Sequence, residues 1–206
     1  PDLPSIDTIH PPLTEPFLTA AVYLGFVNVV ASLLRLGANP NKHDPTTLTP
    51  LITTCFKHHP EMTRLLVTHK ADVNAPLVLD NPDILSKVDL EEYQDPLCDD
   101  FPGAREDSRF SPLYIAVMNN WPDVVHELLQ HPDIDPNAAT NHTKLTPLMY
   151  ASHKGHRENV RLLLGTPSLD LDQKDAMGLN ALAHALLSNS VQVTAEIIMY
   201  DKNPNV

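Results

Sequence analysis

The sequence predicts an all-α solenoid of about five helix–turn–helix repeats, with a long acidic insertion between the second and third repeats. Three observations predict this fold class. A short sequence pattern recurs five times, an apolar run with helical spacing follows each copy, and a turn-rich segment closes each unit. One copy of the pattern would be weak evidence, whereas five correctly spaced copies are strong evidence.

The spacing of the five copies sets the length of the repeat. They begin at Pro16, Thr49, Ser111, Thr146 and Asn180. Successive starts are about 33 to 35 residues apart, except that about 62 residues separate the second from the third. This wider gap holds one repeat and about 29 further residues, which predicts an insertion at that point.

Each copy is expected to form a short first helix. In Thr49-Pro50 and its counterparts, a capping hydroxyl stands just before a proline that is pre-set for the first helical turn. Gly25 and Gly155 can adopt the left-handed conformation that ends this helix, and Asn120 and Asn189 can do so at lower preference.

The rest of each unit is expected to be a second helix and a turn. Apolar residues at i, i+3 and i+4, such as Val125, Leu128 and Leu129, indicate an amphipathic helix. Turn-forming residues then lead into the next unit. In the second repeat, His58 and Lys70 stand where glycine is expected, so strained or rearranged turns are predicted there.

These units resemble the ankyrin-repeat family, whose pattern is Thr-Pro-Leu-His-x-Ala-Ala-x-x-Gly-His, a Leu-Leu helix and Gly-Ala-Asp-Val-Asn. The segments TPLMYASHKGHRENVRLLL at 146–164 and LLRLGANPN at 33–41 carry the resemblance. It implies one domain at 1–206. The repeats that it implies lie at about 13–45, 46–75, 109–140, 144–175 and 178–206, with the insertion at 76–108.

The two ends of the chain leave alternatives open. Polar Gln192, Thr194 and Glu196 flank the last second helix, which suits a capping repeat. The segment Asn203-Pro-Asn205 resembles another inter-repeat turn, which would instead suit further repeats. The chain begins at Pro1 without a methionine, and an excised fragment is one explanation.

The segment Pro76 to Arg105 of the insertion carries eight acidic residues against only Lys87 and Arg105, and it contains no copy of the pattern. The resemblance implies that it grows from an inter-repeat turn, beside the concave groove of the stack. Long loops in compact arrays are usually functional or disordered. Tyr93 and Phe101 among the acids favour a contact with a partner, and a passive loop is the alternative.

Composition excludes several classes of partner and of chemistry. A net charge of −12 opposes binding to nucleic acids and to anionic membranes. Two cysteines, Cys55 and Cys98, give no disulfide framework, which favours an intracellular location, cytoplasmic or nuclear. No apolar run approaches the roughly 20 residues of a membrane helix.

No catalytic, cofactor or metal residues are predicted, although the chain has 11 histidines. His126, His131 and His142 have no carboxylate or cysteine at a recognised zinc spacing. The family pattern implies that His156 packs and hydrogen-bonds within the repeat and that Cys55 occupies the place of a buried alanine. Trp121 is expected to be half-buried and structural.

The resemblance implies a non-catalytic scaffold or adaptor that binds another protein through the concave groove. The groove positions that vary in the family are the two residues before the helix-ending glycine or its substitute. Here they are Tyr23 and Leu24, Phe56 and Lys57, Met118 and Asn119, His153 and Lys154, and Leu187 and Ser188.

Within this set Tyr23, Leu24, Phe56 and Met118 are expected to form an exposed apolar run, which is typical of interfaces. Turn-tip residues are expected to form its polar rim, namely Lys42, His43, Asp44, Asn141, His142 and Lys144. The chain is expected to be a monomer or to self-associate weakly. The alternative function is an enzyme or small-molecule-binding protein with a pocket between the groove and the insertion.

Overall fold

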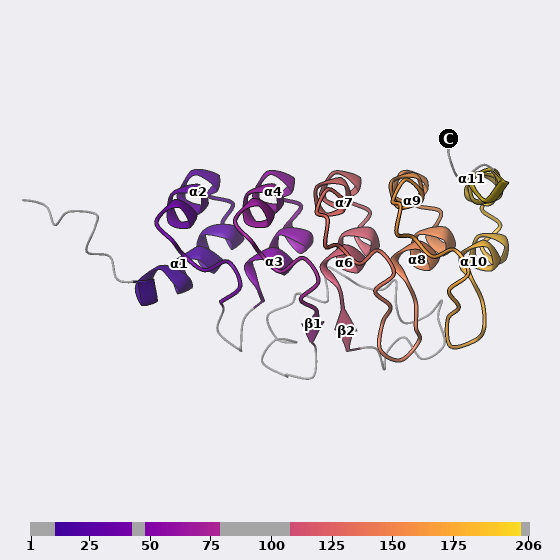
Figure 1. The fold of residues 1–206 in the computed structure, drawn as a ribbon, viewed down its shortest axis with the longest axis horizontal. Helices are drawn as coiled ribbons and strands as arrows, with labels where there is room; N and C mark the ends of the chain where they lie inside the picture. The colour runs from indigo at the N-terminus through magenta and orange to yellow at the C-terminus, as the bar shows by residue number, and fades with distance from the viewer. Residues whose placement is uncertain (1–10, 43–47, 79–107, 203–206) are drawn as a thin grey trace, which may run out of the picture.

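The computed structural model describes residues 11–42, 48–78 and 108–202, and over these residues it confirms the all-α solenoid. Five helix pairs stand side by side in one row (Figure 1). The first helices of the pairs are α1 (Pro11–Tyr23), α3 (Pro50–Lys57), α6 (Pro112–Met118), α8 (Pro147–Lys154) and α10 (Ala181–Leu187). The second helices are α2 (Val27–Arg35), α4 (Pro60–Thr68), α7 (Pro122–Leu129), α9 (Arg157–Leu164) and α11 (Val191–Lys202).

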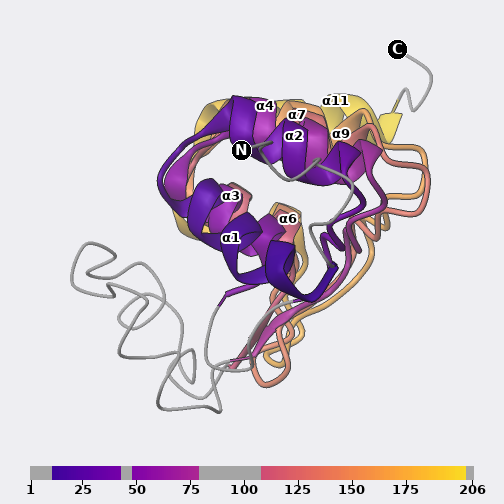
Figure 2. The same ribbon diagram turned by 90° about the vertical axis from the view of Figure 1, so that its left-hand side faces the viewer.

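The helices form two layers. Seen along the stack, the first helices lie in one layer, the second helices in the other, and the inter-repeat turns project to one side (Figure 2). In the first layer α3 packs between α1 and α6, and α8 packs between α6 and α10. In the second layer α4 packs between α2 and α7, and α9 between α7 and α11. Each pair therefore buries its apolar surface mainly on its neighbours.

Side-chain caps start four of the first helices in the same register. The side-chain oxygens of Thr49, Ser111, Thr146 and Asn180 accept hydrogen bonds from the backbone N–H three residues further on, at 3.0 to 3.2 Å. This confirms the predicted capping at Thr-Pro and Ser-Pro. It also shows that Asn180 performs it without a following proline.

The first repeat departs from this pattern. Its first helix begins at Pro11, five residues before the start of the sequence pattern at Pro16. Pro16 stands where the other repeats place a capping Thr, Ser or Asn, and its side chain has no oxygen to accept the hydrogen bond. The capping side chain that starts the first helix in the later repeats is therefore missing in the first repeat.

The second repeat keeps its turns without glycine. His58 and Lys70 adopt left-handed backbone conformations with φ of 56° and 67°, close to the 70° of Gly155. Asn120 and Asn189 do the same, as predicted. For a residue with a Cβ this conformation costs about 1 kcal/mol or more, so the turns are strained but not rearranged.

Asparagine side chains tie the turns of neighbouring repeats together. The Asn74 carboxamide donates to the Asp133 carbonyl at 2.6 Å and accepts from the Asp135 N–H at 2.9 Å. Asn41 makes the same pair of bonds one repeat earlier, and Asn137 makes it one repeat later. Three consecutive turns are thus joined to the next by equivalent amide bridges.

The two described ends of the insertion lie together. Strands β1 (Leu77–Val78) and β2 (Arg109–Phe110) pair antiparallel, with Leu77 opposite Phe110 and Val78 opposite Arg109. The Asn141 side chain accepts hydrogen bonds from the backbone N–H of Ser108 and Arg109, at 2.8 and 3.0 Å. The chain therefore leaves the stack and rejoins it at one place, so α3 still packs directly on α6.

Candidate partner-binding surface

The residues predicted to vary lie at the same end of every first helix. They are the last helical residue and one neighbour in each of α1, α3, α6, α8 and α10. Because the first helices stack side by side, these residues form one line along the stack (Figure 1). We call this line the first-helix row. Its members are Tyr23, Leu24, Phe56, Lys57, Met118, Asn119, His153, Lys154, Leu187 and Ser188.

The amino-terminal end of the first-helix row is exposed and apolar. Tyr23 is 57% exposed and Leu24 is 59% exposed. The Lys57 ammonium lies 4.8 Å from the centroid of the Tyr23 ring, in a cation–π contact. Such contacts at exposed sites contribute about 0.5–1 kcal/mol and hold the two side chains in one arrangement. This end of the row therefore presents a pre-positioned aromatic ring with a cation beside it.

The middle of the row differs from the sequence prediction. Phe56 is only 8% exposed, so the expectation that it continues an exposed apolar run is wrong. Helix α3 lies between α1 and α6, and its Phe56 side chain joins the core. Met118 is half-buried and packs against the same core. Asn119, also half-buried, donates from its amide to the Ile115 carbonyl of its own helix at 3.0 Å.

Toward the carboxyl-terminal end the row becomes polar and then apolar again. His153 and Lys154 are half-buried. The His153 ring lies edge-on to His184, with centroids 5.8 Å apart, and His184 Nε2 lies 2.9 Å from the Asp175 carboxylate. Leu187 at the end of the row is 66% exposed. The two exposed apolar ends thus flank a basic middle section.

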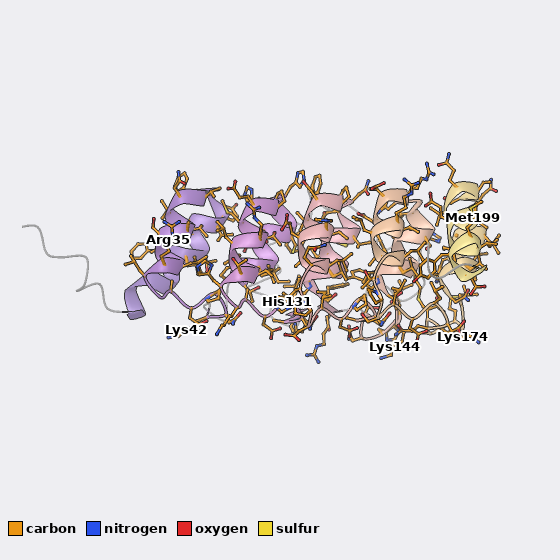
Figure 3. All side chains as sticks on the ribbon, turned by 45° about the horizontal axis from the view of Figure 1, so that its top comes forward. Arg35, Lys42, His131, Lys144, Lys174 and Met199 are labelled. Atoms are coloured by element: carbon orange, nitrogen blue, oxygen red, sulfur yellow. The ribbon has the colours of Figure 1, made fainter. Side chains whose placement is uncertain are left out.

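The predicted rim is described only in part. Lys42, Asn141, His142 and Lys144 are exposed at the turn tips, and Figure 3 shows Lys42 and Lys144 along one edge of the stack. Lys174 also lies there, and sequence reasoning missed it although it occupies an equivalent turn. His43, Asp44, Tyr93 and Phe101 lie outside the described residues.

The histidines and Trp121 at the ends of first helices have structural contacts. The His58 ring stacks on Trp121 with centroids 4.0 Å apart and planes 8° apart, and its Nε2 lies 2.8 Å from the Asp123 carboxylate. Trp121 is half-buried, as predicted. His156 Nδ1 donates to the Val117 carbonyl at 3.0 Å. This bond confirms a packing role for His156, but it joins two repeats and does not stay within one.

The thiol predicted to be inert is buried in the core. Cys55 has no exposed surface, and this burial raises the pKa of its thiol to about 12, against a smaller lowering effect of the Thr54 side chain. Such a thiol is almost entirely protonated near neutral pH and is a poor nucleophile. Cys98 lies outside the described residues. Across residues 11–42, 48–78 and 108–202, no group of three or more His, Cys, Asp or Glu side chains is placed to hold a metal ion.

Burial of two histidines predicts a pH dependence of stability. Burial lowers the pKa of His156 below its ordinary 6.5, against a raising effect of the Val117 hydrogen bond and with a further lowering by Lys154. Burial, and then His58 and Lys57, likewise lower the pKa of His59. The unfolded chain therefore binds a proton at each of these histidines more tightly than the folded chain does. The contribution of the two neutral histidines to the free energy of unfolding is present above about pH 6.5 and is lost as the pH falls below that value.

The pH prediction is checked with His59→Asn/His156→Asn, in which asparagine replaces each ring by a neutral amide. Between about pH 7.5 and pH 5.5 the wild type is expected to lose more unfolding free energy than this variant. Urea denaturation at each pH measures both losses. Equal losses in the two proteins would contradict the prediction.

Comparisons with known proteins agree with the repeat structure. A family model described as ankyrin repeats in three copies matches residues 17–139, 84–175 and 113–206. A Plasmodium falciparum protein that carries the name of an E3 ubiquitin-protein ligase is 26% identical over 154 residues, 66% of this chain. The ankyrin repeat and KH domain-containing protein mask-1 of Caenorhabditis elegans is 26% identical over 164 residues, 77% of this chain. The chain spans only 2% and 6% of the lengths of these relatives.

Among the described residues, no helix has the length and apolar character to cross a membrane.

Proposed function

The chain belongs to the ankyrin-repeat family, and on that premise we propose that it is a non-catalytic protein-interaction module whose partner binds the first-helix row. The observation that carries this proposal is the charge and exposure of the row. Its ends expose Tyr23, Leu24 and Leu187, and it contains no acidic residue, although the whole chain has a net charge of −12. Exposed apolar patches such as these two ends are typical of interfaces.

The charges of the row indicate the chemistry of the partner. Lys57 and Lys154 are its charged members, and His153 directly precedes Lys154 in α8. Acidic groups on a partner would be attracted to this section, since complementary charges raise the rate and the selectivity of association. The partner segment that fits best therefore combines carboxylates with an aromatic or aliphatic anchor for the Tyr23–Leu24 end.

The insertion and the rim extend this proposal. Tyr93 and Phe101 are proposed as additional contacts, and Lys42 and His43 as residues of the polar rim. The ligase name and the KH domain belong to the relatives, and the matched share of those proteins is too small to bring their activities to this chain. The intracellular location proposed from the cysteine content fits a scaffold or adaptor.

A charge-reversal variant tests the proposed binding surface. The chain is immobilised and exposed to a displayed library of peptides, and the retained peptides are sequenced and their affinities measured in solution. We expect the retained peptides to be rich in Asp, Glu and large apolar residues. Lys57→Glu/Lys154→Glu should weaken their binding by about tenfold or more, about 1.4 kcal/mol, because attraction becomes repulsion.

Arg35→Glu/Arg64→Glu provides the matched control, since it makes the same double charge reversal at exposed positions of α2 and α4 in the other helix layer. Binding should remain unchanged in this variant once thermal melting has shown that all variants are folded. Equal affinity of the wild type and Lys57→Glu/Lys154→Glu would contradict the proposal that the partner contacts the basic middle section of the first-helix row. Equal affinity of Tyr23→Ala and the wild type would contradict the apolar anchor.

A further inference from the structure

Apolar exposure is concentrated at the two ends of the stack. Within the described residues, every strongly exposed large apolar side chain belongs to the first helix pair, to the last helix pair or to the turn before α10. Figure 3 labels one of them, Met199, on the last helix pair. The three pairs between α3 and α9 contribute none to this set. Whether a large apolar side chain is strongly exposed therefore depends on whether its helix pair lies at an end of the stack.

The first pair exposes a position that every later pair buries. Val29 on α2 is 47% exposed. The residues at the same place in the next four pairs are Met62, Val124, Asn159 and Val193, and each is at most 1% exposed. Since only the first pair has no described pair before it, this position must face the preceding neighbour. Phe17 on α1 is likewise 62% exposed, where the next pair has the buried Pro50.

The last pair shows the opposite face. Leu186 on α10 is 60% exposed, whereas Val22, Cys55, Val117 and Ser152 at the same place in the other four pairs are fully buried. This position therefore faces the following neighbour. Leucine here is larger and more apolar than the serine of the pair before it. A terminal repeat that meets water needs a polar outer face, and Leu186 does not provide one.

Glu196, one of the polar residues that suggested a capping repeat, does not cover this face. Glu196 on α11 bonds to Arg157 at 2.6 Å and to Arg161 at 3.1 Å, and both arginines lie on α9. The glutamate therefore faces the preceding pair, while Ile198 on the same helix stays 37% exposed. Both ends of the described stack thus keep the apolar character of an interior stacking surface.

We propose that the chain associates head to tail, with the α10–α11 pair of one copy stacked on the α1–α2 pair of the next copy. The occupant is a second copy because the chain itself carries both halves of an interface that it already forms four times internally. Leu186 of one copy then meets the face that carries Phe17 and Val29 in the next copy. Such a heterologous contact leaves a free face at each end, so it produces open chains of varied length.

Association between separate copies is concentration-dependent, because two free molecules lose translational and rotational freedom that linked repeats do not lose. Sedimentation equilibrium of the 206-residue chain, from micromolar to near-millimolar concentration, should show an average mass that rises above that of one chain. Two single variants, Val29→Asp and Leu186→Asp, each place a charge on one face at a position that is already exposed. Each variant alone should remain a single chain.

The mixture of the two variants is the decisive measurement. Each variant keeps one intact face, and the two intact faces are opposite, so an equal mixture should form a one-to-one dimer and no longer species. Met199→Asp is the matched control, because Met199 is 69% exposed on the last pair at a place that is also exposed in the other four pairs, namely at Arg35, Thr68, Gln130 and Gly165. Its association should equal that of the wild type.

Three results would overturn the proposal. A wild-type mass of one chain at every concentration would exclude self-stacking and point to a repeat of other sequence as the occupant. Loss of association in Met199→Asp would place the contact on the outer surface of the second-helix layer. Absence of a dimer in the mixture, with both variants folded by circular dichroism, would show that the contact does not join opposite ends.

Discussion

Replacing Leu128 by alanine is expected to lower the free energy of unfolding by about 3 kcal/mol. The Leu128 side chain has no exposed surface and lies in α7 of the third pair, with α4 on one side and α9 on the other. Alanine leaves a cavity that two packed neighbours close only in part. This is the largest effect that we expect from a single substitution in the array.

Urea denaturation measures this loss, and Leu129→Ala is its matched control. Leu129 follows directly in the same helix but is only half-buried, so the control should lose less than half as much stability. The slope of the transition adds information, because a repeat array is stabilised mainly by contacts between nearest neighbours. A lower slope in Leu128→Ala would mean that the two halves of the array no longer unfold together. Equal losses in the two variants would contradict the packing described for α7.

Replacing Asn74 by alanine is expected to lower the free energy of unfolding by about 2 kcal/mol. The substitution removes a hydrogen bond of 2.6 Å to the Asp133 carbonyl and one of 2.9 Å from the Asp135 N–H. Asn74→Asp should lie between the wild type and alanine. Its carboxylate still accepts from Asp135 but can no longer donate to the Asp133 carbonyl.

Thermal and urea denaturation of these variants test the amide bridge. Asn119→Ala is the control, because the Asn119 amide donates only to the Ile115 carbonyl of its own helix. The control should change stability by less than about 0.5 kcal/mol. A loss at Asn74 as small as the loss at Asn119 would show that the bridge between turns does not stabilise the stack.

Much of the fold could be predicted from sequence because its signals are local. The caps at Thr49, Ser111 and Thr146 need only a hydroxyl and the next turn of helix. The left-handed positions at Asn120 and Asn189 follow from the end of one helix and the start of the next. The regular repeat spacing further indicated that neighbouring helix pairs stack on one another.

The candidate surface was predicted less completely. The family resemblance located the positions of the first-helix row, because each pair of residues stands directly before the helix-ending glycine or its substitute. It did not predict that Phe56 would be buried while Tyr23, at the equivalent place, stays exposed. The two residues differ in their neighbours, since α3 is packed on both sides and α1 on one side only among the described helices. It also missed the amide bridges of Asn41, Asn74 and Asn137, because their partners lie about one repeat away along the chain.

The sequence by itself therefore determined the repeat, its helix boundaries from the second unit onward and the line along which variable residues lie. Only the tertiary structure decided which of those residues are exposed, and that Val29 and Leu186 present stacking faces at opposite ends. The physical reason is the separation along the chain between the residues that interact. Backbone conformation and capping depend on residues within a few positions, whereas burial depends on which helix pair lies alongside.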